Sequence, residues 1–232
     1  MRSKLFLLLS LLLTLPVSAE FLQGDSLIAR AKQLASELEP EAHSALTGLE
    51  RTYKVEVKDN KVTVYGHKIW FYPTTASVQN NAYESIYFNQ LNEQLTVLTA
   101  ASISPAGKVN YVNESHQKVI AEDTYNTFTE TEKMIVSFPA VEVGGVTLIA
   151  YKIEETLTPE RPFWSIRSYP QQTADMLNYS FEAQWDDSAR LYFDNTSELV
   201  SCELQPARVF CQADDLVAAE SDSVVNWGDQ LG

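Results

Sequence analysis

The fold is decided by residues 134–155, MIVSFPAVEVGGVTLIAYKIEE. A strand-like run ends at Phe138-Pro139, because proline cannot donate to a strand ladder and is found at strand edges. Gly144-Gly145 then lets the backbone reverse with a positive φ at little steric cost. The run that follows, 146–153, carries apolar residues on both faces of a strand. The stretch therefore predicts a sheet corner followed by a central strand that is covered on both sides.

Helical spacing occurs near the start of the chain, in GDSLIARAKQLASELEP. Apolar residues recur there every three or four positions, and Asp25 or Ser26 can cap the first turn. We expect a helix over 26–38, limited by Pro40, and a further helical turn over 42–49.

From Tyr53 onward the apolar period is two, as in strands. Asp59-Asn60 and the PAGK stretch at 105–108 are typical of turns. Further strands are expected at 84–90, 95–105, 109–114, 124–139, 175–185 and 189–195. Many closely spaced strands behind one helix predict a mainly β protein, an antiparallel β-sandwich with a short N-terminal helix. The expected organisation is a helical segment at 20–50, a sandwich at 51–213 and an acidic tail or linker at 214–232.

Residues 1–19, MRSKLFLLLSLLLTLPVSA, are typical of a secretory signal peptide cleaved near Ala19. Two basic residues precede an apolar core that is shorter than the ~20 residues needed to span a bilayer. A short membrane anchor is the alternative. We expect a periplasmic or secreted protein without stable membrane insertion. The net charge of −14 argues against nucleic acid and anionic lipid as partners and favours solubility.

Two cysteines, Cys202 and Cys211, stand in LVSCELQPARVFCQA. Folded as a hairpin about Pro206-Ala207, this segment places Cys202 opposite Cys211 and Leu204 opposite Val209, all on one face. A directly opposed pair lies within disulfide reach, and an exported protein favours the bond. A redox-active pair is the alternative, although the Cys-x-x-Cys spacing that lowers a thiol pKa is missing.

Two motifs together resemble a known family. LTVLTAASISPAGKVNYV is a strand leading to a Pro-x-Gly-Lys turn, and the opening stretch has the form F-P-x-V-x-x-G followed by a long strand. In this order they resemble the domain-of-unknown-function family found N-terminal to transglutaminase-like domains in exported bacterial proteins. The resemblance implies a β-sandwich, an envelope location and no activity of the domain itself. Such a chain usually continues into a core with a Cys, a His and an Asp, whereas this sequence ends near Trp227, where the core would begin.

Catalytic and metal motifs find little support in the residues. The three histidines, His43, His67 and His116, all precede Cys202, and a Gly-x-Ser-x-Gly elbow is missing. The acidic doublets at 186–187 and 214–215 lack EF-hand spacing and are interpreted as solvated turn residues. The expectation is a protein without catalytic residues, metal or cofactor.

Aromatic clusters are the stronger lead. In PERPFWSIRSYP, Arg161, Trp164, Arg167 and Tyr169 combine stacking faces with guanidinium groups, as a site for a glycan, a peptide or a periplasmic partner protein would require. KIWFYPT, 68–74, is a second cluster, and core packing is the alternative for both. We therefore expect an exported, soluble, non-catalytic binding module. The alternatives are an accessory domain of a longer or split transglutaminase-like hydrolase and a purely structural envelope protein.

Overall fold

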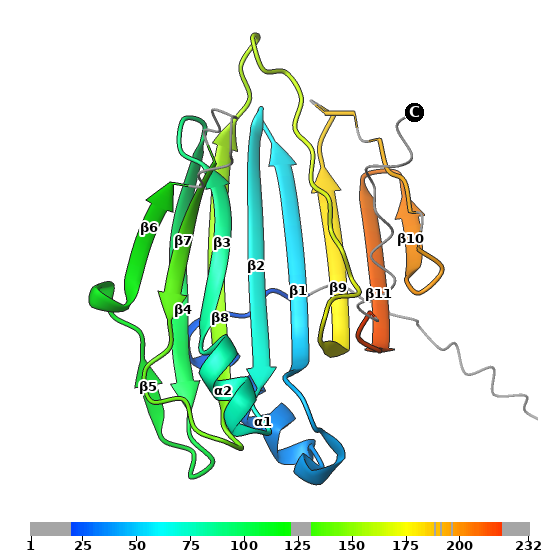
Figure 1. The fold of residues 1–232 in the computed structure, drawn as a ribbon. Helices are drawn as coiled ribbons and strands as arrows, with labels where there is room; N and C mark the ends of the chain where they lie inside the picture. The colour runs from blue at the N-terminus through cyan, green and yellow to red at the C-terminus, as the bar shows by residue number, and fades with distance from the viewer. Residues whose placement is uncertain (1–19, 122–130, 188, 191, 196, 220–232) are drawn as a thin grey trace, which may run out of the picture.

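The computed structural model describes residues 20–121, 131–187, 189–190, 192–195 and 197–219. The predicted signal peptide and residues 220–232 of the predicted tail lie outside this part. Two β-sheets face each other across a shared core, and a helix covers the other side of the larger sheet (Figure 1). The prediction of a mainly β sandwich with an N-terminal helix is thereby confirmed.

The large sheet has the strand order β10-β11-β9-β1-β2-β8-β4-β5. Its strands are β1 (Thr47–Lys58), β2 (Lys61–Phe71), β4 (Glu93–Ile103), β5 (Val109–Tyr111), β8 (Val146–Thr156), β9 (Asp175–Trp185), β10 (Ser201–Gln205) and β11 (Arg208–Leu216). The small sheet has the order β3-β7-β6, with β3 (Tyr83–Asn89), β6 (Gln117–Ala121) and β7 (Thr131–Ser137). Neighbouring strands are antiparallel except β1 and β9, which are parallel.

The sheet corner predicted from residues 134–155 carries the chain from one sheet to the other. β7 ends at Ser137 in the small sheet, and β8 begins at Val146 in the large one. Gly144 has a φ of 80°, and a Cβ at Gly145 would lie 2.8 Å from the carbonyl oxygen of Ile103, so both positions favour glycine. The corner therefore joins the two layers of the sandwich.

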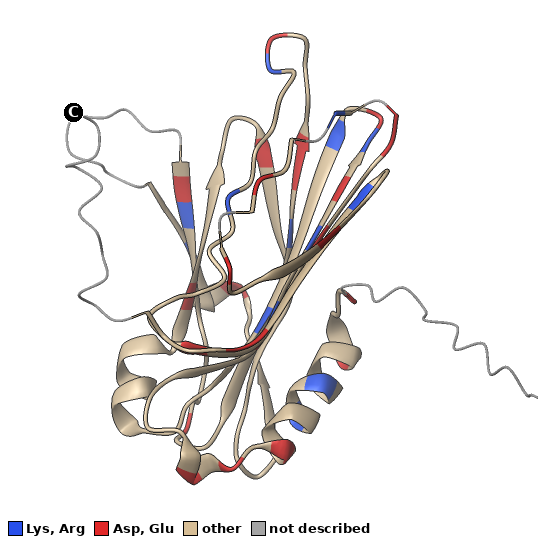
Figure 2. Cartoon of the chain, turned by 90° about the vertical axis from the view of Figure 1, so that its right-hand side faces the viewer, with Lys and Arg blue, Asp and Glu red and all other residues tan. Residues whose placement is uncertain are grey.

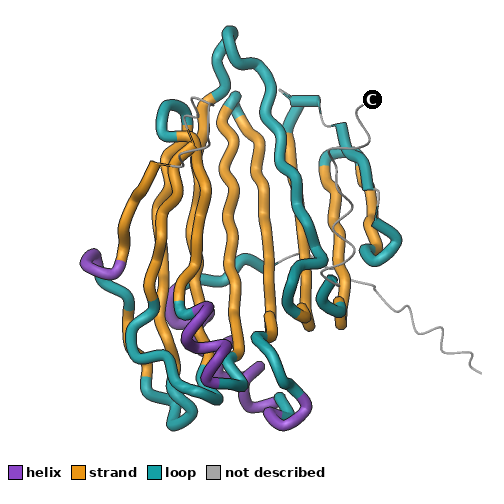
Figure 3. Tube along the Cα trace, in the orientation of Figure 1, coloured by secondary structure: helices purple, strands orange, loops and turns teal. Residues whose placement is uncertain are grey.

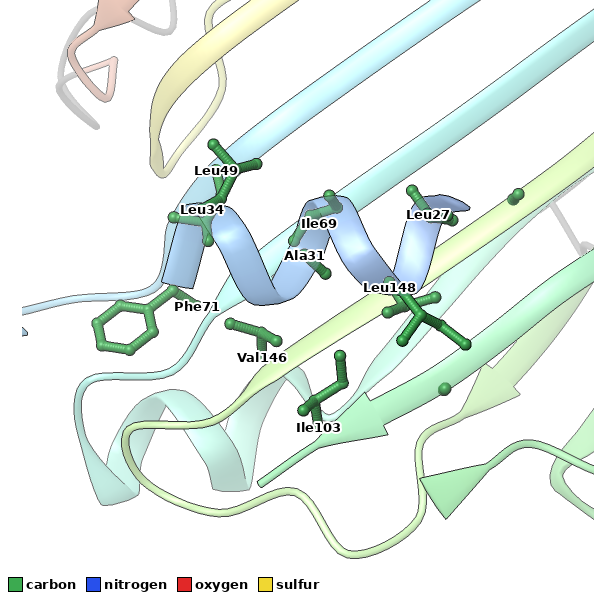
Figure 4. Packing of buried hydrophobic residues seen from close by; sticks show 12 residues of the cluster. Leu27, Ala31, Leu34, Leu49, Ile69, Phe71, Ile103, Val146 and Leu148 are labelled. Atoms are coloured by element: carbon green, nitrogen blue, oxygen red, sulfur yellow. The ribbon is translucent and has the colours of Figure 1, made fainter. Parts of the chain in front are cut away.

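β8 is covered on both faces, as the sequence predicts. Val146 and Leu148 pack in the core beneath helix α1 (Gly24–Glu37), whereas Ile149 and Tyr151 pack in the core shared with the small sheet. Figure 4 shows the first of these cores, where the buried face of α1 lies across β2, β8 and β4. The central place of β8 between β2 and β4 follows from this double burial.

The beginning of the chain corrects two expectations. Neither Asp25 nor Ser26 caps α1, because the helix starts at Gly24 with Gln23 as its N-cap, and the Ser26 hydroxyl donates instead to the Gln23 carbonyl. The helical turn predicted over 42–49 is wrong. A 3₁₀ turn, η1 (Pro40–Ala42), ends at the first residue of that range, and β1 begins at Thr47 because β2 and β9 both pair with its residues.

Hydrogen bonds to buried side chains hold the start of α1 on the sheet. The Leu22 amide donates to Nδ1 of His67 (3.2 Å), so the other ring nitrogen, Nε2, donates to the Glu50 carboxylate (3.0 Å). Arg30 on α1 also pairs with Glu50, at 2.6 Å. Burial alone would raise the pKa of Glu50, but the hydrogen bonds from His67 and Arg30 and the positive charge of Arg30 hold it below its ordinary value.

Local turn chemistry follows the sequence closely. Asp59 and Asn60 have φ values of 52° and 61° and close the β1–β2 hairpin as a two-residue turn.

In the β10–β11 hairpin, Cys202 lies opposite Cys211 and forms the predicted disulfide. The strand predicted over 189–195 is wrong for its described residues, which pair with no neighbouring strand. Phe193 packs partly buried against the sheet, and Tyr192 is exposed.

Two smaller elements complete the structure, and neither was predicted from the sequence. Helix α2 (Thr75–Asn81) begins with a reciprocal capping pair between Thr74 and Ser77, and the 3₁₀ turn η2 (Glu114–His116) precedes β6. Within the described residues, the helices are too short and too polar to cross a membrane. Basic and acidic positions are interspersed along the strands (Figure 2).

Candidate functional site

The loop that joins β8 to β9, residues 157–174, carries the predicted ligand-binding residues. It has no helix or strand and runs beside β1 and β9 (Figures 1 and 3). It lies over a further hydrophobic cluster of the large sheet, here called the second core, which includes Val55 of β1, Phe181 of β9 and Val209 of β11. Leu157 and Trp164 pack into that core. An isolated antiparallel β-bridge between Thr158 and Arg161 closes the first turn of the loop. The loop is thus a strap laid along the sheet and fixed at several points.

The structure brings only part of the predicted set together. Arg167 donates to the Tyr169 hydroxyl at 3.4 Å, and both side chains are exposed, that of Tyr169 to 59%. Arg161 instead lies 3.7 Å from Glu155 of β8. Trp164 is half-buried against the core, which is the packing alternative stated for these aromatics. The neighbouring Phe163 is 78% exposed and offers the free aromatic face that Trp164 lacks.

Two hydrogen bonds fix the backbone where the exposed pair stands. Nη1 of Arg51, on β1, donates to the Tyr169 carbonyl oxygen at 2.9 Å. The hydroxyls of Ser168 and Tyr179 lie 2.8 Å apart, which joins the loop to β9. Further along, the Gln171 side chain donates to the Val217 carbonyl. The loop therefore has a defined path although it lacks a strand ladder.

Beneath the loop lies a buried polar cluster, formed by Arg51, Tyr53, Lys68, Glu84 and Tyr151. Lys68 of β2 bridges the two sheets, with Nζ 2.6 Å from Oε1 of Glu84 on β3. Nε and Nη2 of Arg51 donate to the Tyr53 hydroxyl at 3.2 and 3.0 Å. The cluster thus contains two cationic side chains, Arg51 and Lys68, and one carboxylate, Glu84.

The tyrosines of this cluster meet above a glycine. Tyr53, Gly66 and Tyr151 are cross-strand neighbours on β1, β2 and β8. A Cβ at Gly66 would lie 2.7 Å from the Tyr151 hydroxyl, so the missing side chain makes room for it. Burial alone would raise the pKa of Tyr53, but the positive charges of Lys68 and Arg51 hold it below its ordinary value, whereas burial raises the pKa of Tyr151.

Sequence reasoning missed this cluster, although a signal is present. Arg51 and Lys68 stand in phase with the apolar faces of their strands, two residues before Tyr53 and two before Trp70. A charged residue in phase with buried positions predicts a buried ion pair.

In the second aromatic cluster, Phe71 and Tyr72 are core residues, and Trp70 donates to Glu84 at 3.3 Å.

The chemistry available at the surface is recognition. Phe163 and Tyr169 offer flat apolar faces, and the Arg167 guanidinium offers a planar fork of donors that matches a carboxylate. The described residues contain no group of three or more His, Cys, Asp or Glu side chains placed to hold a metal ion. The two thiols of the chain are joined to each other, and His67 is engaged by Leu22 and Glu50.

The fold is similar to solved structures. A structure described as "a putative protease" from Parabacteroides distasonis ATCC 8503 superposes with a TM-score of 0.65 at 11% identity. The match covers 78% of this chain but 37% of that one, so this chain spans little more than a third of its length. At that identity the likeness concerns the fold alone.

Two structures of the family 3a carbohydrate-binding module from the cipA scaffoldin of Clostridium thermocellum match more weakly. Their TM-scores are 0.30 and 0.31, with 11% and 12% identity over 53% and 54% of this chain and 78% and 88% of theirs. At these scores nothing about this chain follows from them.

No curated protein matches the sequence. A family model does, over residues 58–208, which include the β2–β8–β4 core, the strap and β10, and which end at the first residue of β11. The matched range covers well over half of the chain. The chain therefore belongs to the family described as Domain of Unknown Function with solved-structure structure (DUF3857).

Proposed function

We propose that this chain is an exported, non-catalytic β-sandwich module that binds a carboxylate-bearing glycan, peptide or partner protein through loop 157–174. The observation that carries the proposal is the exposed Arg167–Tyr169 pair, with Phe163 nearby in the sequence, on a loop fixed to the sheet. A fixed loop loses little conformational freedom on binding, which favours affinity.

The ligand class follows from charge and shape. An aromatic ring stacks on the apolar face of a sugar or on an apolar side chain, and a guanidinium pairs with a carboxylate in bidentate geometry. The chain as a whole has a net charge of −14, which repels anions at long range. Selective binding of a carboxylate therefore needs a local cationic group, and Arg167 supplies one on the exposed strap.

The test is an array that carries uronic-acid oligosaccharides, their neutral counterparts, and peptides with and without acidic side chains. We expect capture of carboxylated members. Arg167→Gln should weaken it by about tenfold or more, the equivalent of one charge-assisted hydrogen bond. Tyr169→Ala should also weaken it. The matched control is Tyr111→Ala, because Tyr111 on β5 is as exposed as Tyr169, at 59%. No capture, or equal loss in the control, would refute the proposal.

Trp164→Ala does not serve this test. Trp164 packs against the second core, so its truncation removes buried contacts and destabilises the fold whether or not a ligand binds.

A second candidate is an accessory domain of a longer or split transglutaminase-like hydrolase. The observation that favours it is the structure described above as "a putative protease", in which the matching region is 37% of a longer chain. Reading the coding sequence beyond Gly232 tests it. An open frame with a Cys–His–Asp core would support the accessory role, and a stop codon with no such gene alongside would remove it.

A further inference from the structure

We propose that Arg51, with Tyr179 beside it, is a positioning residue for loop 157–174. Arg51 holds the backbone carbonyl of Tyr169 and Tyr179 holds the side chain of Ser168, so that the side chains of Arg167 and Tyr169 stand together at the surface. Its consequence for binding rests on the function proposed above. The positioning itself concerns the free protein and is tested without a ligand.

The guanidinium of Arg51 has a fixed orientation. Its side chain is on a strand and the residue is 5% exposed. Two of its nitrogens donate to the Tyr53 hydroxyl, and its central carbon lies 4.9 Å from the Tyr53 ring centre and 5.9 Å from that of Tyr179. The third nitrogen, Nη1, is thereby aimed at the Tyr169 carbonyl oxygen, 2.9 Å away.

Tyr179 fixes the preceding residue of the loop. It is the cross-strand neighbour of Arg51 in the parallel β1–β9 pair, and its hydroxyl lies 2.8 Å from that of Ser168. Two consecutive loop residues are therefore joined to two adjacent strands. In extended backbone, residues two apart project to the same side, so fixing 168 and 169 determines how Arg167 meets Tyr169.

Burying a guanidinium at this place is costly. Arg51 is the direct neighbour of Lys68 across β1 and β2, and Glu84 is bonded to Lys68 rather than to Arg51. A buried ionic group contributes less to stability than a well-packed apolar residue of similar volume often would. The bond to Tyr169 gives the arginine a role that an apolar side chain could not fill, namely the selection of one loop conformation.

Limited trypsin digestion of the full-length folded protein measures the proposed effect. Trypsin cleaves after Arg167 when the loop opens, whereas the bond after Arg161 is protected by Pro162. The reference is cleavage after Lys108, an exposed turn residue on another part of the sandwich. Arg51→Met should raise the rate after Arg167 by about tenfold or more, and Tyr179→Phe, which removes one hydroxyl, by about three- to tenfold, with the Lys108 rate unchanged.

The outcomes separate the two proposals. Unchanged cleavage after Arg167 in both variants overturns the positioning role, and so does an equal increase after Arg167 and Lys108, which would report global unfolding. Tyr179→Phe keeps the test decisive if Arg51→Met does not fold. An array without any bound member refutes the proposed function and leaves this cleavage result as it stands.

Discussion

The ion pair between Lys68 and Glu84 should be the polar contact that contributes most to joining the two sheets. Nζ and Oε1 are 2.6 Å apart, and each side chain is 12% exposed. Glu84→Gln keeps the shape but leaves Lys68 beside Arg51 without a carboxylate. Breaking a buried pair costs roughly 3–5 kcal/mol, a large fraction of a typical stability of about 5–15 kcal/mol. We expect the lower end of that range, because the amide oxygen of the substituted side chain can still accept from Lys68 or Trp70.

The assay is urea unfolding at neutral pH of the wild type, Glu84→Gln, Lys68→Met and the double variant Lys68→Met/Glu84→Leu. The free energy of unfolding should fall far less in the double variant than the sum of the losses in the two single variants. Both charges of the pair are removed together in the double variant, so neither stays buried without its partner. A loss below about 1 kcal/mol for Glu84→Gln would place the pair among solvated surface contacts. Additive losses would also refute the reasoning, since they would mean that the two side chains do not depend on each other.

Three further predictions concern the framework. Reducing Cys202–Cys211, or replacing both cysteines by serine, should lower the unfolding free energy by about 2–3 kcal/mol in urea titrations, because the closed loop is short; an unchanged midpoint would contradict this. Glu50→Gln should make the free energy of unfolding depend less on pH below neutrality. The depressed pKa of Glu50 stabilises the folded protein above its unfolded pKa of about 4.3, and this stabilisation is lost as pH falls through the folded value. A variant as acid-sensitive as the wild type would be the contrary result. Gly66→Ala should lower the free energy of unfolding by about 1–3 kcal/mol, because the new Cβ would lie 2.6 Å from Cζ of Tyr151. The loss should be smaller in a Tyr151→Leu background. Thermal melts of the wild type, the two single variants and the double variant would measure both effects.

Local rules account for what could be predicted from the sequence. The β1–β2 turn depends on the positive φ values of Asp59 and Asn60, and the cysteine pairing depends on a two-residue turn with fixed register. The burial of β8 on both faces is visible in its own residues. In each case the determining residues are neighbours in the chain.

Long-range pairing could not be predicted in this way. The division of the strands into eight and three, and the parallel contact of β1 with β9, depend on segments that are far apart in the chain. The helical turn expected over 42–49 fails for the same reason. Residues 47–49 of that segment begin β1 because β2 and β9 pair with this strand on both sides, and tertiary pairing overrides local propensity.

The candidate site shows the same division between local and distant causes. An aromatic and cationic loop at 161–169 could be predicted from composition, yet which of its aromatics is free depends on the core beneath it. Trp164 packs inward because the sheet offers an apolar surface there, and Phe163 is therefore turned to solvent. The residues that fix the backbone at 169 and 168 stand on β1 and β9, at separations of 118 and 11 positions in the sequence. A surface loop of this kind depends on its supporting strands, so substitutions at Arg51 should affect the loop as much as substitutions within it.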